Sequence, residues 1–551
     1  MTSASDASRT PPSTISRRGL LATAPLLGIG AAGLLGAPAA TATPALAPVR
    51  GRADLVETSA GWVRGRRTAG VSSFLGIPYG GPTGGANRFR RPTAPAAWSG
   101  IRDAAAYGHV APQPIPGARL DYTRLIGWLD QPGGQDEDCL VLNVWTPGPG
   151  AARRPVLVSF HGGGFSSGSG NHRGFDGDPL ARFGDVVVVT VNHRLGLLGF
   201  LHLADLGAPQ EWASAGVNGM LDAVAALRWV NENIAGFGGD PGNVTVFGQS
   251  GGGAKTSTLL AMPSANGLLH RAAVQSGSTL TLATRESGTR NASRLLARLG
   301  LSTRRITELR DVPVEMLVSA QAGLEAATPP AQFAPVVDGV AIPRDPFAPT
   351  APEVSKHVPM IISATRDEAT AFASDPDLTE AGLLVAARVI AGEANAARVI
   401  AEYRGEYPGA SPALLLARMT TDSGFLTAAR TQAERKAALG GAPAYMYLFT
   451  WASPADPARW AATHGIDVGL VFHNADTPIT GDNTPRARKL ADELAGAWVR
   501  FATTGNPNGN GLPEWPAYEP GNRKTLVLGD TTAVEADPLR RFRLLWEELS
   551  G

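Results

Sequence analysis

Short, unbroken runs of apolar residues alternate with a helical pattern in the middle of the chain. Residues 155–160, 186–191 and 244–247 are apolar at nearly every position, which is typical of strands buried on both faces of a sheet. Between the last two runs, apolar side chains recur at helical spacing, at Met220, Leu221, Val224, Leu227, Val230 and Ile234. This spacing predicts an amphipathic helix. Strand, helix and strand in this order favour an α/β architecture with a parallel, helix-flanked sheet.

The pattern differs on either side of this region. Residues 55–65 and 72–78 alternate apolar and polar side chains, which predicts an antiparallel N-terminal ribbon. Residues 278–442 contain mostly Ala- and Leu-rich helical patterns, interrupted by one strand candidate at residues 358–363. The chain has no internal repeat and no linker long enough to separate a second domain. We therefore expect residues 48–551 to form a single domain, with a helical lid or insert region at roughly 280–440.

The first 47 residues have the layout of a signal peptide. Arg17 and Arg18 precede an apolar segment over residues 20–37, and Ser16-Arg17-Arg18-Gly19-Leu20-Leu21 resembles the twin-arginine signal that directs folded proteins across a membrane. Two A-x-A sites predict cleavage near residue 42 or 47. Pro25 and several glycines favour a removable segment over a membrane anchor. We expect an exported protein, secreted or periplasmic, without stable membrane insertion.

Composition excludes several other classes of protein. The chain has 49 Lys and Arg against 48 Asp and Glu, a net charge of +1, and so lacks the basic footprint of a nucleic-acid binder. A hydrophobic fraction of 43% with 18% charged residues argues against disorder. The single cysteine forbids an intramolecular disulfide and a multi-thiolate metal site. The histidines are scattered without ligand spacing, so we expect neither a metal nor a cofactor.

A serine motif follows the last buried run. Gly248-Gln249-Ser250-Gly251-Gly252 fits G-x-S-x-G directly after residues 244–247, and a helix can begin beyond it. A serine on such a strand-to-helix turn takes a strained backbone conformation, which the flanking glycines permit. We expect Ser250 to be a nucleophile. The alternative is a Gly- and Ser-rich loop without chemistry, because 66 glycines make chance matches common.

A glycine-rich loop lies upstream of this serine. His161-Gly162-Gly163-Gly164-Phe165 follows the run at residues 155–160, and its glycines leave backbone N–H groups free to point at an anion. The G-K-[ST] pairing of a phosphate loop is missing. The N–H groups of Gly163, Gly164 and Gly251 are therefore candidates for an oxyanion hole.

A serine nucleophile also needs a base and an acid that orients the base. In G-x-S-x-G hydrolases the acid and then the histidine follow the serine along the chain. Asp367 and Glu368 come soon after the strand candidate at residues 358–363, and His464 and His473 lie beyond them. Either carboxylate can instead cap the next helix. The residues alone leave both choices open.

Longer motifs connect the chain to a known family. They are Phe74-Leu75-Gly76-Ile77-Pro78-Tyr79, Glu137-Asp138-Cys139-Leu140, Phe237-Gly238-Gly239-Asp240-Pro241 and Phe501-Ala502-Thr503-Thr504-Gly505-Asn506-Pro507. From about residue 55 to 546 the chain resembles the type-B carboxylesterases and cholinesterases. The resemblance implies an α/β-hydrolase fold, with a central, mostly parallel twisted sheet, an N-terminal antiparallel ribbon and helical insertions that form a gorge or lid.

The resemblance also implies roles for the candidate residues. Asp367-Glu368 matches a family pair whose second member is the triad acid, and His464-Gly465-Ile466-Asp467 matches the histidine segment. The implied triad is Ser250, Glu368 and His464. The implied function is hydrolysis of a small-molecule carboxylic ester through an acyl-enzyme.

Departures from the cholinesterases bear on the substrate. Gln249 stands where they carry a glutamate beside the nucleophile, and Trp128 lies close to the position of their choline-stacking indole, although a gorge wall or core aromatic is the more ordinary role. With Phe165, these residues are candidates for the substrate pocket, and a neutral or apolar ester is favoured. The same triad can hydrolyse amides or polyesters, and the fold also serves esterase-like binding modules that lack a working triad. The sequence does not indicate an oligomeric state.

Three further residue positions are interpreted through the resemblance. Ala111 stands where relatives have the disulfide partner of Cys139, so that cross-link is missing. Ser276 matches a buried serine near the triad, for which we expect a structural hydrogen-bonding role. Arg88 and Glu137 match an ion pair that braces the N-terminal region.

Overall fold

The structure is a computed structural model that describes residues 54–114, 120–128, 130–373, 375–509 and 511–550. All of them belong to one unit, Gly51–Gly551. The signal segment expected at residues 1–47 lies outside the described residues. Within the described ranges, no helix combines the length and the apolar character needed to cross a membrane.

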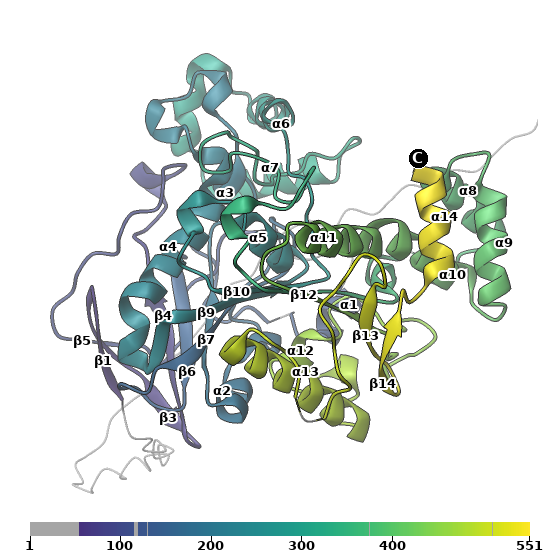
Figure 1. Cartoon of the computed structure of the whole chain (residues 1–551). Helices are drawn as coiled ribbons and strands as arrows, with labels where there is room; N and C mark the ends of the chain where they lie inside the picture. The colour runs from purple at the N-terminus through teal and green to yellow at the C-terminus, as the bar shows by residue number, and fades with distance from the viewer. Residues whose placement is uncertain (1–53, 115–119, 129, 374, 510, 551) are drawn as a thin grey trace, which may run out of the picture. The chain divides into compact units, whose positions relative to one another are not determined.

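Eleven strands of the described residues pair into one large sheet (Figure 1). From edge to edge they are β14 (Thr532–Ala536), β13 (Lys524–Leu528), β12 (Ala444–Phe449), β11 (Met360–Thr365), β10 (Arg271–Gln275), β9 (Gly239–Gln249), β7 (Arg154–Phe160), β8 (Val187–Val191), β6 (Val141–Thr146), β4 (Val71–Pro78) and β3 (Arg66–Thr68). Neighbours from β13 through β8 pair in parallel. Pairs nearer the two edges are antiparallel. The predicted mostly parallel α/β sheet is confirmed, and its three buried runs are β7, β8 and β9.

Helices cover both faces of the sheet because alternate side chains of each central strand point in opposite directions. Val156 and Val158 of β7 belong to one hydrophobic core, and Leu157 belongs to the other. The helices of the first core include α3 (Gly196–Phe200), α4 (Asn218–Asn233), α5 (Gly251–Leu259) and α11 (Thr427–Ala438). Those of the second include α1 (Leu120–Leu125), α2 (Asp178–Gly184), α12 (Val468–Val471) and α13 (Pro485–Thr504).

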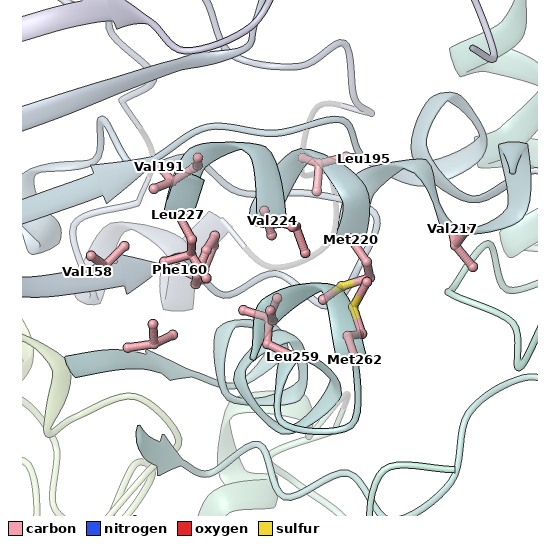
Figure 2. Close-up of a cluster of buried hydrophobic side chains, with 14 of the residues drawn as sticks. Val158, Phe160, Val191, Leu195, Val217, Met220, Val224, Leu227, Leu259 and Met262 are labelled. Carbon is pink, nitrogen blue, oxygen red and sulfur yellow. The ribbon is translucent and has the colours of Figure 1, made fainter. Parts of the chain in front are cut away.

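Helix α4 is the helix predicted between two of the buried strands. Figure 2 shows Val224 and Leu227 of α4 beside Phe160 at the end of β7, and Met220 beside Met262. These five side chains are at most 2% exposed, and each contributes about 1.5–3 kcal/mol when fully buried. This packing fixes the carboxyl end of β7, beside the candidate site.

The helices of residues 280–440 do not form a single insert. Helices α6 (Arg285–Arg298) and α7 (Val314–Glu325) pack into the first core. Helices α8 (Glu380–Ala391), α9 (Ala396–Glu406) and α10 (Pro412–Thr420) share a separate core with the C-terminal α14 (Arg540–Ser550). Figure 1 shows these four helices grouped together. Strand β11 lies between the two groups in the sequence and belongs to the central sheet.

The predicted antiparallel N-terminal strands are present, but they belong to two different sheets. Residues 55–65 form their own hairpin, β1 (Leu55–Thr58) with β2 (Gly61–Arg64), and β5 (Ile101–Asp103) adds a third strand. Strand β4 instead pairs with β3 and β6 in the large sheet. Alternation identified half-buried strands, but it carries no information about which strands are neighbours.

A buried ion pair supports the segment after β8. The Arg194 guanidinium donates Nε to Oδ2 of Asp222 on α4 at 2.8 Å and Nη2 to Oδ1 at 2.6 Å. The two side chains are 2% and 0% exposed. Removing one partner would leave the other charge buried and unpaired.

We predict that Asp222→Ala lowers the free energy of unfolding by about 3–5 kcal/mol. The exposed pair of Arg64 and Asp103 offers a matched control, and Asp103→Ala should move the denaturation midpoint little. Urea denaturation followed by circular dichroism measures both. Equal midpoint shifts in the two variants would contradict this view of the buried pair.

Candidate active site

Ser250 stands on a sharp turn between β9 and α5. Its backbone has φ 58° and ψ −124°, a sparsely populated combination for a residue with a side chain. The Ser250 N–H donates to the Gln275 carbonyl at 2.8 Å, and the Ser250 carbonyl accepts from the Ala254 N–H at 2.9 Å. The predicted strained strand-to-helix turn is therefore present, and the serine side chain is partly exposed.

Glycines around Ser250 allow three backbone segments to touch. A Cβ atom on Gly252 would lie 1.9 Å from the Phe160 carbonyl oxygen, at the end of β7. A Cβ atom on Gly251 would lie 2.1 Å from the carbonyl oxygen and 2.5 Å from the nitrogen of Gly164. The loop after β7 and the first turn of α5 are thus in direct backbone contact. The structure brings Gly251 and Gly164 together, as a shared oxyanion hole would require.

Glu368 and His464 are joined in the interior. The Nδ1 atom of His464 is hydrogen-bonded to Oε2 of Glu368, and Oε1 accepts from the Thr365 N–H at 2.7 Å. The His464 side chain is 3% exposed and the Glu368 side chain is 0% exposed. The Nε2 atom of His464 is also buried and has no hydrogen-bond partner among the described residues, Ser250 included. Contacts between a nucleophile and its base are often loose without substrate.

The alternative acid and base candidates have other partners. Asp367 forms an ion pair with Arg418 at 2.8 Å and accepts from the Ala462 N–H at 3.1 Å. His473 contacts Asp492 at the surface at 2.8 Å. Of the four candidates, the structure therefore brings together Glu368 and His464.

Gln249 lies where the loops of the site meet. A Cβ atom on Gly162 would be 3.2 Å from its Oε1, and a Cβ atom on Gly465, next to His464, would be 3.4 Å from its Nε2. The glycine-rich loop at residues 161–165, the candidate oxyanion loop, and the loop at residues 464–467, the histidine loop, thus approach each other around the residue that precedes Ser250. Gln249 is only 1% exposed, so its side chain does not form an open pocket wall in this structure.

Asp467 is a buried group that the sequence analysis did not single out as functional. Its Oδ2 accepts from the Tyr447 hydroxyl at 2.5 Å and from Gln275 Nε2 at 3.0 Å. Burial raises the pKa of Asp467, and the nearby carboxylate of Glu368 raises it further. The sequence feature that could have identified Asp467 is its place in His464-Gly465-Ile466-Asp467, three residues after the candidate base. The network braces the helix that follows the histidine loop.

Trp128 borders the oxyanion loop. Its ring stacks on Phe175 with centroids 5.5 Å apart, and a Cβ atom on Gly162 would lie 2.6 Å from it. Tyr122, six residues earlier, donates its hydroxyl to the His464 carbonyl at 2.6 Å. The segment around α1 therefore lies against both the oxyanion loop and the histidine loop.

Phe165 lines a cavity of about 840 Å³ beside the oxyanion loop. Thr279 and Leu282 also line this cavity. Gly277, two residues before Thr279, packs against the Ser250 backbone, because a Cβ atom on Gly277 would lie 2.2 Å from the Ser250 carbonyl oxygen. A second cavity, of about 540 Å³, is lined by Tyr122 and Thr370 on the histidine side.

The positions interpreted through the family resemblance have mixed outcomes. Arg88 donates Nε to Oε1 of Glu137 at 2.8 Å and Nη1 to the Val312 carbonyl at 2.6 Å, so this ion pair ties the N-terminal region to the segment before α7. Cys139 is free and buried. Ser276 is buried, as the resemblance implies, and its hydroxyl has no hydrogen-bond partner in the described part of the chain, so its structural role stays a prediction.

No group of three or more His, Cys, Asp or Glu side chains in the described ranges is arranged to hold a metal ion.

Comparisons with known proteins point to one family. A model described as the carboxylesterase family matches residues 52–542. The chain is 36% identical to the para-nitrobenzyl esterase of Bacillus subtilis, over 88% of this chain and 96% of that protein. It is 35% identical to the phenmedipham hydrolase of Pseudarthrobacter oxydans, over 88% and 97%. A crystal structure of a Geobacillus stearothermophilus carboxylesterase, 36% identical, matches with a TM-score of 0.77 over 89% of this chain and 99% of that one.

We predict that Gly252→Ala disrupts the turn at Ser250, because the added methyl group would collide with the Phe160 carbonyl. The variant should be destabilised by about 1–3 kcal/mol and should lose ester hydrolysis. Gly521→Ala is a matched control, since a Cβ atom there meets nothing within 4 Å. Thermal denaturation and initial rates measure both variants. Wild-type stability and activity in Gly252→Ala would contradict the described backbone contact.

Proposed function

The chain belongs to the carboxylesterase family and has its α/β-hydrolase fold, and from this premise we propose that it hydrolyses neutral or apolar carboxylic esters through Ser250, His464 and Glu368. As a family member it is a carboxylic ester hydrolase that acts on small-molecule esters. The observation that carries the proposed triad is the buried hydrogen bond between Glu368 and His464 Nδ1, while His464 Nε2 has no hydrogen-bond partner among the residues that the structure describes.

In the proposed first step, His464 Nε2 takes the proton of the Ser250 hydroxyl as the oxygen attacks the ester carbonyl. The N–H groups of Gly163, Gly164 and Gly251 donate to the oxyanion of the tetrahedral intermediate. Glu368 holds the imidazole through Nδ1 and stabilises its positive charge without taking the proton. The protonated imidazole then donates to the departing alcohol, which leaves an acyl group on Ser250.

Water repeats the sequence in the second step. His464 takes a proton from the water as it attacks the acyl carbonyl, and the same N–H groups hold the second oxyanion. Return of the proton to Ser250 releases the carboxylic acid and restores the free enzyme.

The residue beside the nucleophile supports a neutral substrate, because Gln249 carries no charge. The cavity next to the oxyanion loop combines the apolar Phe165 and Leu282 with polar side chains and with Arg290 and Arg294. Polyester hydrolysis is a second candidate. A structurally similar esterase from Clostridium hathewayi, 32% identical with a TM-score of 0.76, is described as hydrolysing aliphatic aromatic polyesters.

A panel of p-nitrophenyl esters, a para-nitrobenzyl ester and a polyester film can separate these two candidates. We expect soluble esters of short acyl chains to be the better substrates. Release of acid from the film at a rate comparable to that from the soluble esters would favour the second candidate.

We predict that Ser250→Ala reduces hydrolysis of p-nitrophenyl acetate to background, because the attacking oxygen is removed. The fold should persist, since the change only truncates a partly exposed side chain. Initial rates and circular dichroism measure the two effects. Labelling with a fluorophosphonate should be stoichiometric in the wild type and absent in the variant. Retained turnover in Ser250→Ala would exclude this serine as the nucleophile.

We also propose that residues 1–47 direct export by a twin-arginine route. The support is the Arg17-Arg18 pair ahead of an apolar segment. A free, buried Cys139 is compatible with this route, because a chain without a disulfide can fold before it leaves the cytoplasm.

We predict that changing Arg17 and Arg18 together to lysine retains the protein in the cytoplasm of a bacterial host that has a twin-arginine translocase. Fractionation and immunoblotting measure the precursor and the cleaved form. Arg9→Lys, which preserves charge outside the motif, is the control. Export of the double variant at the wild-type level would contradict the proposed route.

A further inference from the structure

Lys255 is a buried lysine directly behind the oxyanion loop. It lies on α5, just over one turn beyond Ser250, and is 0% exposed. Its Nζ atom donates to the His161 carbonyl at 3.1 Å and to the Gly164 carbonyl at 2.9 Å. No carboxylate of the described residues forms an ion pair with it. Burying an ammonium group without a counter-charge is costly, so a role for this side chain is expected.

The two carbonyls that Lys255 contacts stand at the two ends of one short loop. His161 and Gly164 bracket Gly162 and Gly163, and the carbonyls of these inner residues have partners of their own. The Gly162 carbonyl contacts His161 Nδ1 at 2.8 Å, and the Gly163 carbonyl accepts from the Ser167 N–H at 3.1 Å. All four consecutive carbonyls of the loop are therefore held.

This pattern of held carbonyls determines where the loop N–H groups point. In a planar trans peptide the N–H lies opposite the carbonyl of the same peptide unit. The Gly162 carbonyl fixes the direction of the Gly163 N–H, and the Gly163 carbonyl fixes that of the Gly164 N–H. Lys255 fixes the peptide units on either side of these two. The φ values of +91° at Gly163 and +63° at Gly164 show that the loop has a backbone conformation that residues with side chains rarely adopt.

We propose that Lys255 is a positioning residue for ester hydrolysis, which pins both ends of the His161-Gly162-Gly163-Gly164 loop and so keeps the Gly163 and Gly164 N–H groups aimed at the oxyanion. The proposal rests on the proposed function, because it assigns those N–H groups to the oxyanion hole. Lys255 itself does not touch the substrate.

The surroundings of Lys255 are consistent with this role. Nζ lies 5.4 Å from the centroid of the Phe165 ring, which offers a cation–π contact. The stacked rings of His161 and His193 are close to it, and burial together with the Lys255 charge lowers the pKa of both. Burial lowers the pKa of Lys255 to about 7. Both the ammonium and the neutral amine have at least two N–H donors, so the loop is held in either state.

A second buried lysine provides a matched control. Lys436 on α11 is 2% exposed, and its Nζ donates to the carbonyls of Ser355 at 3.1 Å and Lys356 at 2.9 Å. The two lysines make the same kind of contact, but the carbonyls held by Lys436 lie before β11, outside the oxyanion loop. If the role of Lys255 were purely structural, substitution of either lysine should have the same effect on stability and on kcat.

The test compares Lys255→Met with Lys436→Met. Both variants should show similar shifts in denaturation midpoint. Only Lys255→Met should lose kcat, by about 10²-fold, which is the typical effect of losing an oxyanion donor, while KM changes less than about threefold. Inhibition by a boronic acid, whose tetrahedral adduct uses the oxyanion hole, should weaken by a similar factor in that variant alone.

Three results would overturn the proposal: an unchanged kcat in Lys255→Met, a loss confined to KM, or an equal loss in Lys436→Met. If Lys255→Met does not fold, Lys255→Gln replaces it, because the shorter amide keeps a donor and should give a smaller loss of kcat. An unchanged kcat in that variant also overturns the proposal. Failure of the wild type to bind the boronic acid would instead contradict the proposed function.

Discussion

The sharp turn at Ser250 is the constraint on which the rest of the site depends. A backbone with positive φ costs about 1–3 kcal/mol, and here it is held by direct contact between main chains. Gly252 lies against the end of β7, and Gly251 lies against Gly164. These contacts bring the oxyanion loop to the serine, and they place the next turn of α5, with Lys255, behind that loop. The packing of α4 and α5 on the central strands supplies the rigid support.

Much of the fold followed from the sequence because burial on both faces leaves a strand little choice of residues. The unbroken apolar runs predicted β7, β8 and β9, and helical spacing predicted α4. The division of the N-terminal strands between two sheets could not be predicted in the same way. Alternation marks a half-buried strand, whereas pairing depends on contacts far along the chain, such as those between β4 and β6. The division of the helices at 280–440 into two groups could not be predicted either. The core of one group includes residues of α14, which lies far along the chain.

The candidate site was only partly accessible from local sequence. Asp367 and Glu368 are neighbours in the sequence, and only their partners distinguish their roles. Arg418 pairs with Asp367, and His464 pairs with Glu368. Lys255 gave no local signal. A lysine within a short polar helix is usually solvated, and its two partners are backbone carbonyls about 90 residues earlier in the chain. Gln249 was expected at the pocket, but the convergence of Gly162 and Gly465 around it buries its side chain.

The central claim is that Ser250, His464 and the N–H groups of Gly163, Gly164 and Gly251 act on one carbonyl. A crystal structure of the enzyme inactivated by a p-nitrophenyl phosphonate tests it most directly, because the adduct resembles the tetrahedral intermediate. We expect phosphorus to be bonded to Ser250 Oγ, with the phosphoryl oxygen about 2.7–3.1 Å from the nitrogens of Gly163, Gly164 and Gly251. Phosphorus on another residue, or a phosphoryl oxygen turned away from these nitrogens, would contradict the claim.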